Sequence, residues 1–287
     1  MNYYGAVLII ITLIAAMAYG LYRFSQYRRS RRLQQIDSLP FPDEYARILY
    51  SLPHYSRLDN SDRETLHRSV LRFVHTKEFI GIGIDVNNEM RLIIAFYACL
   101  LLLRKNAPEP YPNTRTILIY PDSVVIEQQR NDGGIVTDES VEIDGQSADG
   151  TVVITWDAAY DEAVTQGDAN LILHEFTHEI DFMDGSIDGI PPMEASKVSR
   201  WTEVLDGEFD ALYTLVRNNK ELGEYALFGE DAALDEAEFF AVATERFFGV
   251  PGELATRFPE LYEELRGFYG LDTALLFQAA KENVTEA

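Results

Sequence analysis

The feature that most constrains this chain is a pair of histidines four residues apart on an apolar segment with helical spacing. The segment reads Leu171-Ile-Leu-His-Glu-Phe-Thr-His-Glu-Ile-Asp-Phe-Met-Asp-Gly185. On an α-helix, His174 and His178 lie one turn apart on the same face, so both imidazoles can bind one zinc ion. Without a partner they would be costly on an apolar helix. The sequence therefore predicts a metal-binding helix with Asp168 as its N-cap and Gly185 at its end.

Glu175 lies directly after the first of these histidines and completes an H-E-x-x-H motif. A helix turns by about 100° per residue, so its carboxylate is expected beside the metal without being a ligand. From there it can take a proton from a water that zinc has activated, as in metallopeptidases. Glu175 is therefore the predicted general base. Asp181, one turn beyond His178, is a candidate acceptor for orienting an imidazole.

A catalytic zinc of this kind needs a third protein ligand. The longer signature H-E-x-x-H-x-x-G-x-x-H would place glycine and histidine where the chain has Asp181 and Asp184, and no histidine follows His178. The other three histidines, His54, His67 and His75, show no ligand pattern and are predicted to be ordinary loop, surface or core residues. A carboxylate is therefore expected as the third ligand.

The best region for that carboxylate is the helical stretch 235–248, where Glu238 and Glu245 are seven residues apart and share one face. Glu238 has an alternative role in a capping box with Asp235 as N-cap. Glu245 has an alternative role in an ion pair, or as a hydrogen-bond partner of a metal ligand. Spacing alone leaves the choice between them open.

Two segments around these residues resemble a family of zinc-dependent peptidases called Mlc titration factor A, or glucose-regulated metallopeptidases. They are Leu173-His-Glu-Phe-Thr-His-Glu-Ile-Asp181 and Ala237-Glu-Phe-Phe-Ala-Val-Ala-Thr-Glu245. The resemblance extends from about Phe41 to about Gly270. It implies a gluzincin-type peptidase in which His174, His178 and Glu238 hold Zn²⁺ and Glu175 is the catalytic acid and base.

The resemblance also implies partners and a further catalytic group. Because one member is named for binding the glucose repressor Mlc, a transcriptional regulator is an expected partner beside a peptide or protein substrate. The family carries a tyrosine shortly before the ligand glutamate, which helps to hold the oxyanion. Tyr225 stands thirteen residues before Glu238, and Phe228, which has no hydroxyl, stands ten before it. Tyr225 is the favoured equivalent.

The N-terminal segment predicts a membrane anchor. Tyr3 to Tyr22 carries no charge and, as a helix, would span about 30 Å, the thickness of a bilayer core. Five arginines follow it, at 23, 28, 29, 31 and 32, so the positive-inside rule places the main domain in the cytoplasm. The expectation is a single-pass protein of the bacterial inner (cytoplasmic) membrane, with an anchor over 1–24 and a basic juxtamembrane linker over 25–42.

The rest of the chain is strongly acidic. The first 36 residues hold five of the 24 lysines and arginines and no acid, so all 47 acidic residues lie beyond them. Such a domain repels nucleic acid, and direct binding to DNA or RNA is not expected. A zinc metallopeptidase domain is predicted over 43–275 and a C-terminal tail over 276–287.

The patterning predicts an α+β fold: an N-terminal transmembrane helix, then a zincin-like domain with a small sheet and the H-E-x-x-H helix. Helices are expected over 43–52, 61–76 and 89–103, strands over 116–120, 123–128 and 152–156, and turns over 131–134 and 144–149. The last strand precedes the metal helix. It is either an edge strand that binds extended substrate or a plain core strand, and both remain open.

The function that these features predict is that of a membrane-anchored zinc-dependent peptidase, in which Glu175 is the general base for attack by water. The alternative is a regulator-binding protein that sequesters a repressor and has weak or secondary peptidase activity. An intact Glu175 favours the enzyme, because binding alone needs no general base.

Overall fold

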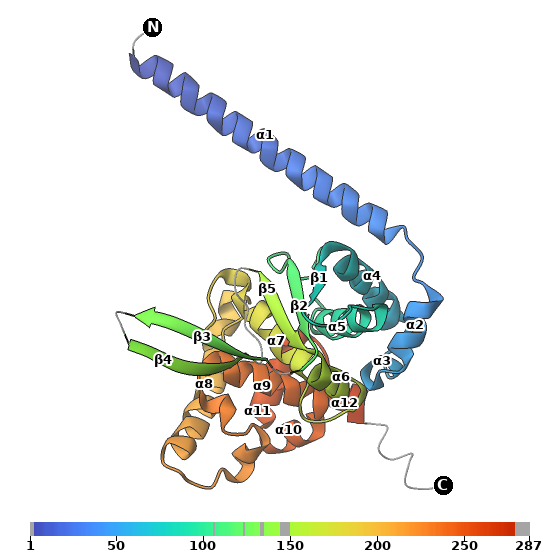
Figure 1. Ribbon diagram of the computed structural model, residues 1–287, viewed down its shortest axis with the longest axis vertical. Helices are drawn as coiled ribbons and strands as arrows, with labels where there is room; N and C mark the ends of the chain where they lie inside the picture. The colour runs from blue at the N-terminus through green and yellow to red at the C-terminus, as the bar shows by residue number, and fades with distance from the viewer. Residues whose placement is uncertain (1–2, 106, 123, 133–134, 144–149, 279–287) are drawn as a thin grey trace. The chain divides into compact units, whose positions relative to one another are not determined.

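The computed structural model describes residues 3–105, 107–122, 124–132, 135–143 and 150–278, with side chains placed for Tyr4 and over 11–105, 107–122 and 150–277. The predicted turn over 144–149, Gly133 and Gly134, Ser123 and most of the predicted tail lie outside the described residues. The chain divides into two compact units, Met1–Phe41 and Pro42–Ala287 (Figure 1).

The first unit is one continuous helix, α1 (Tyr3–Asp37), which passes through all five arginines. None of the helices in the described part of the chain is long and apolar enough to cross a membrane. The predicted transmembrane anchor, and with it the predicted single-pass inner-membrane localisation, is therefore wrong.

The second unit is mostly helical around a small parallel sheet. The sheet has the strand order β1-β2-β5, with β1 (Glu78–Gly81) parallel to β2 (Thr116–Tyr120) and β2 parallel to β5 (Thr151–Thr155). The register pairs Thr116 with both Glu78 and Thr151. A separate antiparallel hairpin, β3 (Val124–Asp132) and β4 (Ile135–Ile143), lies between β2 and β5 in sequence.

The helices of this unit follow in chain order. They are α2 (Asp43–Tyr50), α3 (Pro53–Ser56), α4 (Asn60–Thr76), α5 (Asn88–Leu101), α6 (Trp156–Val164), α7 (Leu171–Asp181), α8 (Ala195–Arg217), α9 (Glu236–Gly249), α10 (Pro251–Arg257), α11 (Pro259–Tyr269) and α12 (Thr273–Gln278), with short 3-10 turns η1 (Phe182–Asp184), η2 (Gly223–Leu227) and η3 (Asp231–Ala233). The three predicted N-terminal helices are confirmed as α2, α4 and α5. Of the predicted strands, two are confirmed as β2 and β5, and β3 covers most of the third.

Helix α5 forms the centre of the core. Every residue from Leu92 to Leu101 is buried, because the sequence there is apolar without interruption, and α5 packs against α2, α4, α6 and α7. Burial of each large apolar side chain contributes about 1.5–3 kcal/mol to folding. The aromatic ring of Phe176 on α7 lies 5.5 Å from that of Phe73 on α4 and 4.8 Å from that of Tyr111. The apolar face of α7 is thereby fixed, and its opposite face carries the histidines.

The loop after α7 fixes α7 relative to α9. Asp181 Oδ2 accepts hydrogen bonds from the backbone N–H groups of Asp188 (3.0 Å) and Gly189 (2.8 Å). Trp201 Nε1 donates to the Gly189 carbonyl at 2.8 Å. Gly189 has φ +74°, and a Cβ there would lie 2.7 Å from the carbonyl oxygen of Glu236. The loop backbone therefore packs directly against the first turn of α9, a contact that only glycine permits.

Replacement of Gly189 by alanine should test this contact. Gly189→Ala adds both the cost of positive φ and a backbone collision, so we expect a loss of unfolding free energy of about 2–4 kcal/mol. Gly223→Ala is the matched control, because Gly223 has φ +57° and open space around its Cβ position, so we expect a loss of about 1 kcal/mol. Urea denaturation followed by circular dichroism measures both, and equal losses would show that the packing contact is unimportant.

Candidate metal centre

The N-cap of α7 is Asn170, two residues later than predicted. The Asn170 side-chain oxygen accepts a hydrogen bond from the Leu173 N–H at 3.0 Å, and the Leu171 N–H donates to Glu162 Oε2 at 2.6 Å. These bonds satisfy N–H groups that have no partner within the helix. Asp168 is therefore not the N-cap, and Glu162 on α6 escaped prediction because no sequence pattern links it to α7.

The two histidines of α7 point their Nε2 atoms at each other. The Nε2 atoms of His174 and His178 are 3.2 Å apart, and the ring centroids are 4.9 Å apart. Their side chains are 19% and 15% exposed, so the pair lies at the surface edge of an otherwise buried helix. The pair is thus partly open to solvent, and the helix period alone produces the pairing.

Helix α9 places a carboxylate at the same point. Asp235 is its N-cap, as the alternative capping-box interpretation had it, and accepts a hydrogen bond from the Glu238 N–H at 2.9 Å. The Glu238 side chain is not used to complete a capping box. Its Oε2 lies 3.3 Å from His174 Nε2, and its Oε1 lies 3.3 Å from His178 Nε2. α7 and α9 pack against each other, and this packing brings the histidines and Glu238 together although they are far apart in the sequence (Figure 1).

The three side chains fit a metal ion by both geometry and chemistry. His174, His178 and Glu238 each offer one ligand atom, and these atoms all lie within 4.8 Å of one another. Ligands of a tetrahedral zinc, with bonds of about 2.0–2.1 Å, stand about 3.3 Å apart. The separations of 3.2 and 3.3 Å therefore match a zinc site. Two imidazole nitrogens and one carboxylate are the ligands of a catalytic site that keeps one position open.

Glu245 supports this group from the other side of His174. Its Oε1 lies 2.9 Å from His174 Nδ1, and its Oε2 accepts a hydrogen bond from the Asn170 N–H at 2.7 Å. A proton on Nδ1 leaves Nε2 as the ligand atom. The geometry therefore separates the two glutamates, with Glu238 at the convergence of the imidazoles and Glu245 behind one of them.

The shifted pKa values of His174 and Glu238 show that these clustered side chains favour a bound positive charge. Burial opposes a charged His174, but hydrogen bonds to Glu238 and Glu245 outweigh burial and raise its pKa to about 10. The two imidazoles hold the pKa of Glu238 well below its usual range. A cation of higher charge competes with the proton for the same atoms.

Glu175 is buried beside this group, with 4% of its surface exposed. Burial raises the pKa of its carboxyl to about 8, the charge of His174 opposes this, and the charge of Glu238 adds to it. In the described part of the chain its side chain makes no hydrogen bond, so its oxygens are not committed to another protein group. A carboxyl that titrates near neutral pH suits general acid–base work.

Two other candidates from the sequence lie in different surroundings. The Tyr225 hydroxyl donates to Glu208 Oε2 at 2.6 Å, and none of its described contacts reaches His174, His178 or Glu238. Its role at an oxyanion stays a prediction. Asp181 bonds the loop backbone described above instead of an imidazole, because α7 ends there and the loop turns back over it.

The other histidines lie in the packed core or at the surface of the protein. His54 is buried in α3, not in a loop, and its ring nitrogens lie 3.2 Å from the Tyr97 hydroxyl and 3.1 Å from the Phe248 carbonyl. His67 hydrogen-bonds the Tyr55 hydroxyl at 2.7 Å. Among the described residues, the only group of histidines, cysteines and acids with metal-binding geometry is His174, His178 and Glu238.

The motif and its geometry together point to the metallopeptidases as the class. The family model described as "Glucose-regulated metallo-peptidase M90" matches residues 24–270, and the chain belongs to this family. It is 33% identical over 273 residues to an uncharacterized protein of Synechocystis, covering 93% of this chain and 96% of that protein. It is 32% identical to Mlc titration factor A of Serratia proteamaculans (82% of this chain, 90% of that protein) and 31% identical to Mlc titration factor A of Cronobacter sakazakii (82% and 88%). The family resemblance predicted from the sequence is confirmed.

The metal assignment predicts one bound zinc per chain. His174→Ala and His178→Ala should each lose it, since each removes one of three protein ligands. His75→Ala is the matched control, because His75 is exposed on α4 and remote from the motif in sequence. Elemental analysis of the purified proteins measures the zinc. Full zinc content in the His174→Ala, His178→Ala double variant would exclude this site.

The positions of Glu238 and Glu245 predict which of the two residues contributes more to zinc affinity. Glu245→Ala should weaken zinc binding about 10–100-fold, the usual effect of removing a group that orients a ligand. Glu238→Ala should weaken it more, because it leaves two protein ligands. Competition with a chromophoric chelator measures both affinities, and the reverse order would exchange the roles of the two residues.

Proposed function

We propose that this chain is a zinc-dependent peptidase that hydrolyses peptide bonds, with His174, His178 and Glu238 as metal ligands and Glu175 as the general base. The observation that carries the proposal is the convergence of two Nε2 atoms and one carboxylate within 3.2–3.3 Å beside a buried Glu175. Membership of a metallopeptidase family supports the same reaction. When bound, zinc would supply a Lewis acid that polarises a carbonyl and acidifies water.

The chain's own residues then have separate tasks. Glu175 accepts a proton from the attacking water and returns it to the leaving nitrogen, as a general base and then a general acid. Glu245 holds the His174 ring in one orientation and one tautomer through Nδ1. Because Glu245 also bonds the Asn170 N–H, the ring is fixed relative to the start of its own helix.

The sheet offers a place for an extended substrate. β5 is an edge strand of the three-stranded sheet and contacts α7, the helix that carries the motif. A peptide can add to such an edge through main-chain hydrogen bonds. Alternate residues of β5 are buried, in the pattern of a strand with one face in the core, so the core and substrate roles are compatible. We propose that substrate lies along β5.

A second function, the binding of a transcriptional regulator, is supported by the names of relatives. The Serratia and Cronobacter relatives are called Mlc titration factor A. We propose that regulator binding, if this chain shares it, uses a surface whose function does not need Glu175, because a general base contributes nothing to binding. The two functions can therefore be separated by one substitution.

Glu175→Gln should keep zinc and the fold but lower peptide hydrolysis about 10²–10⁴-fold, since it removes the proton acceptor and leaves the ligands. Glu236→Gln is the matched control, because Glu236 is exposed in the first turn of α9. Cleavage of a quenched fluorescent peptide library measures hydrolysis, and elemental analysis measures zinc. Near-wild-type hydrolysis by Glu175→Gln would exclude the mechanism. Retained binding of a regulator by the same variant would support the second function independently.

A further inference from the structure

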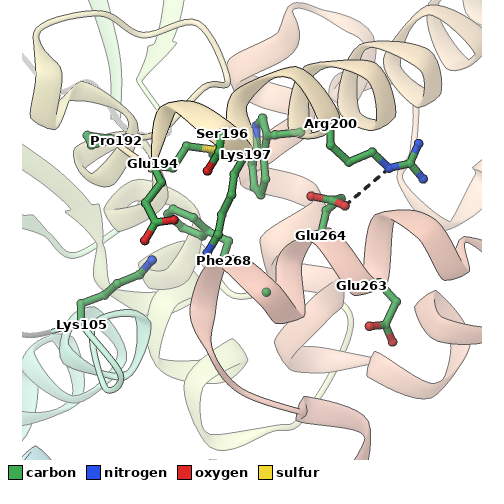
Figure 2. Close-up of a pocket in the computed structure, with 12 residues that line it drawn as sticks. Lys105, Pro192, Glu194, Ser196, Lys197, Arg200, Glu263, Glu264 and Phe268 are labelled. Carbon is green, nitrogen blue, oxygen red and sulfur yellow. Dashed lines mark ion pairs between the residues drawn. The ribbon is translucent and has the colours of Figure 1, made fainter.

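A cavity of about 510 Å³ lies on residues that the metal centre does not use (Figure 2). It is bounded by Lys105 just after α5, by the start of α8 and the segment before it, and by α11. None of the proposed metal ligands lines it. Small-molecule sites usually have about 300–1,000 Å³, so the volume is that of a ligand pocket. The lining residues are Lys105, Pro192, Met193, Glu194, Ser196, Lys197, Arg200, Trp201, Glu263, Glu264, Gly267 and Phe268.

Two aromatic rings form a rigid apolar wall of this cavity. Trp201 and Phe268 are 2% and 9% exposed, and their ring centroids are 5.2 Å apart. The Trp201 indole is held by its hydrogen bond to the Gly189 carbonyl and by the Phe240 ring 5.3 Å away. A wall that is already ordered costs little conformational entropy when a ligand binds.

Two lysines face the same space from different elements. The Lys105 ammonium lies 3.6 Å from the Phe268 ring centroid, and Lys197 extends from the first turn of α8 toward the same ring (Figure 2). Burial lowers the pKa of Lys105 to about 8, and the nearby charge of Lys197 lowers it too. Within the described part of the chain, neither ammonium is ion-paired with a carboxylate. An anion between them would relieve their mutual repulsion.

Two of the three acidic residues that line the cavity form ion pairs with arginines. Glu263 pairs with Arg266 at 2.6 Å, and Glu264 lies 3.7 Å from Arg200. Glu194 is the remaining acid, at the N-cap position of α8, where it makes no side-chain cap hydrogen bond. The lysine side of the cavity is thus a basic spot on a chain of formal net charge −23.

We propose that this cavity binds a small organic anion with an apolar body, of the aromatic carboxylate class. The ring of such a ligand would lie against Phe268 and Trp201, and its carboxylate would lie between Lys105 and Lys197. The apolar wall contributes burial, and the lysines contribute charge-assisted hydrogen bonds. Recognition needs both parts, which separates this class from uncharged aromatics and from inorganic anions.

The experiment uses Trp201 as its own reporter. The chain has two tryptophans, Trp156 and Trp201. In a full-length Trp156→Phe background, titration with 4-phenylbutyrate should change the Trp201 fluorescence saturably. 4-Phenylbutan-1-ol, which has the same body without the charge, should bind at least about tenfold more weakly, since a hydrogen bond to a charged group is worth about 1.5–3 kcal/mol.

Substitutions in that background then assign the contacts. Lys105→Gln and Lys197→Gln should each weaken 4-phenylbutyrate binding about tenfold, and Glu194→Gln should strengthen it by removing a like charge. Lys220→Gln, an exposed lysine beyond the end of α8, should leave binding unchanged. Lys197 is exposed, so its variant keeps the test valid if Lys105→Gln does not fold. The absence of saturable binding at millimolar ligand, equal binding of the alcohol, or wild-type affinity in the Lys197→Gln variant would overturn the proposal.

Discussion

The arrangement of the metal centre depends on one carboxylate, that of Glu245. One of its oxygens lies 2.9 Å from His174 Nδ1 and the other accepts the Asn170 N–H at 2.7 Å. It is 7% exposed, so both contacts are made in a region of low dielectric, where charge-assisted hydrogen bonds are strong. Because α9 carries Glu245 and Glu238 on one face two turns apart, one helix both contacts the His174 ring from behind and brings the Glu238 carboxylate to the two imidazoles.

The parts of this site that follow from helix periodicity could be predicted from the sequence. His174 and His178 converge because residues four apart share a face, and the three N-terminal helices appear where apolar spacing places them. The choice between Glu238 and Glu245 could not be made this way. Their spacing is compatible with either order, and only the packing of α7 on α9 brings the Glu238 carboxylate to the imidazoles.

The predictions that failed are of two kinds. Two concern which groups a polar side chain hydrogen-bonds, and one concerns the length and apolarity of the N-terminal helix. Asp168 and Asn170 are both suitable N-caps by residue type, and the partners Glu162 and Glu245 that favour Asn170 come from two other helices, α6 and α9. Asp181 has the spacing of an imidazole partner but bonds the loop instead. The uncharged N-terminal run suggested a spanning segment, yet none of the described helices has the length and apolarity to cross a bilayer.

The close contact between Gly189 and the Glu236 carbonyl also bears on which parts of the chain can change length. Besides the packing of the two helices, two routes join α7 to α9: the covalent path through α8, η2 and η3, and the direct backbone contact at Gly189. The direct contact lies two residues before Glu238, so the short loop after α7 acts together with the packing of α7 on α9 to position that carboxylate. Insertions and deletions between α8 and η3 are therefore expected to disturb it less than the insertion or deletion of one residue between Asp181 and Gly189, which would move the backbone that contacts the first turn of α9.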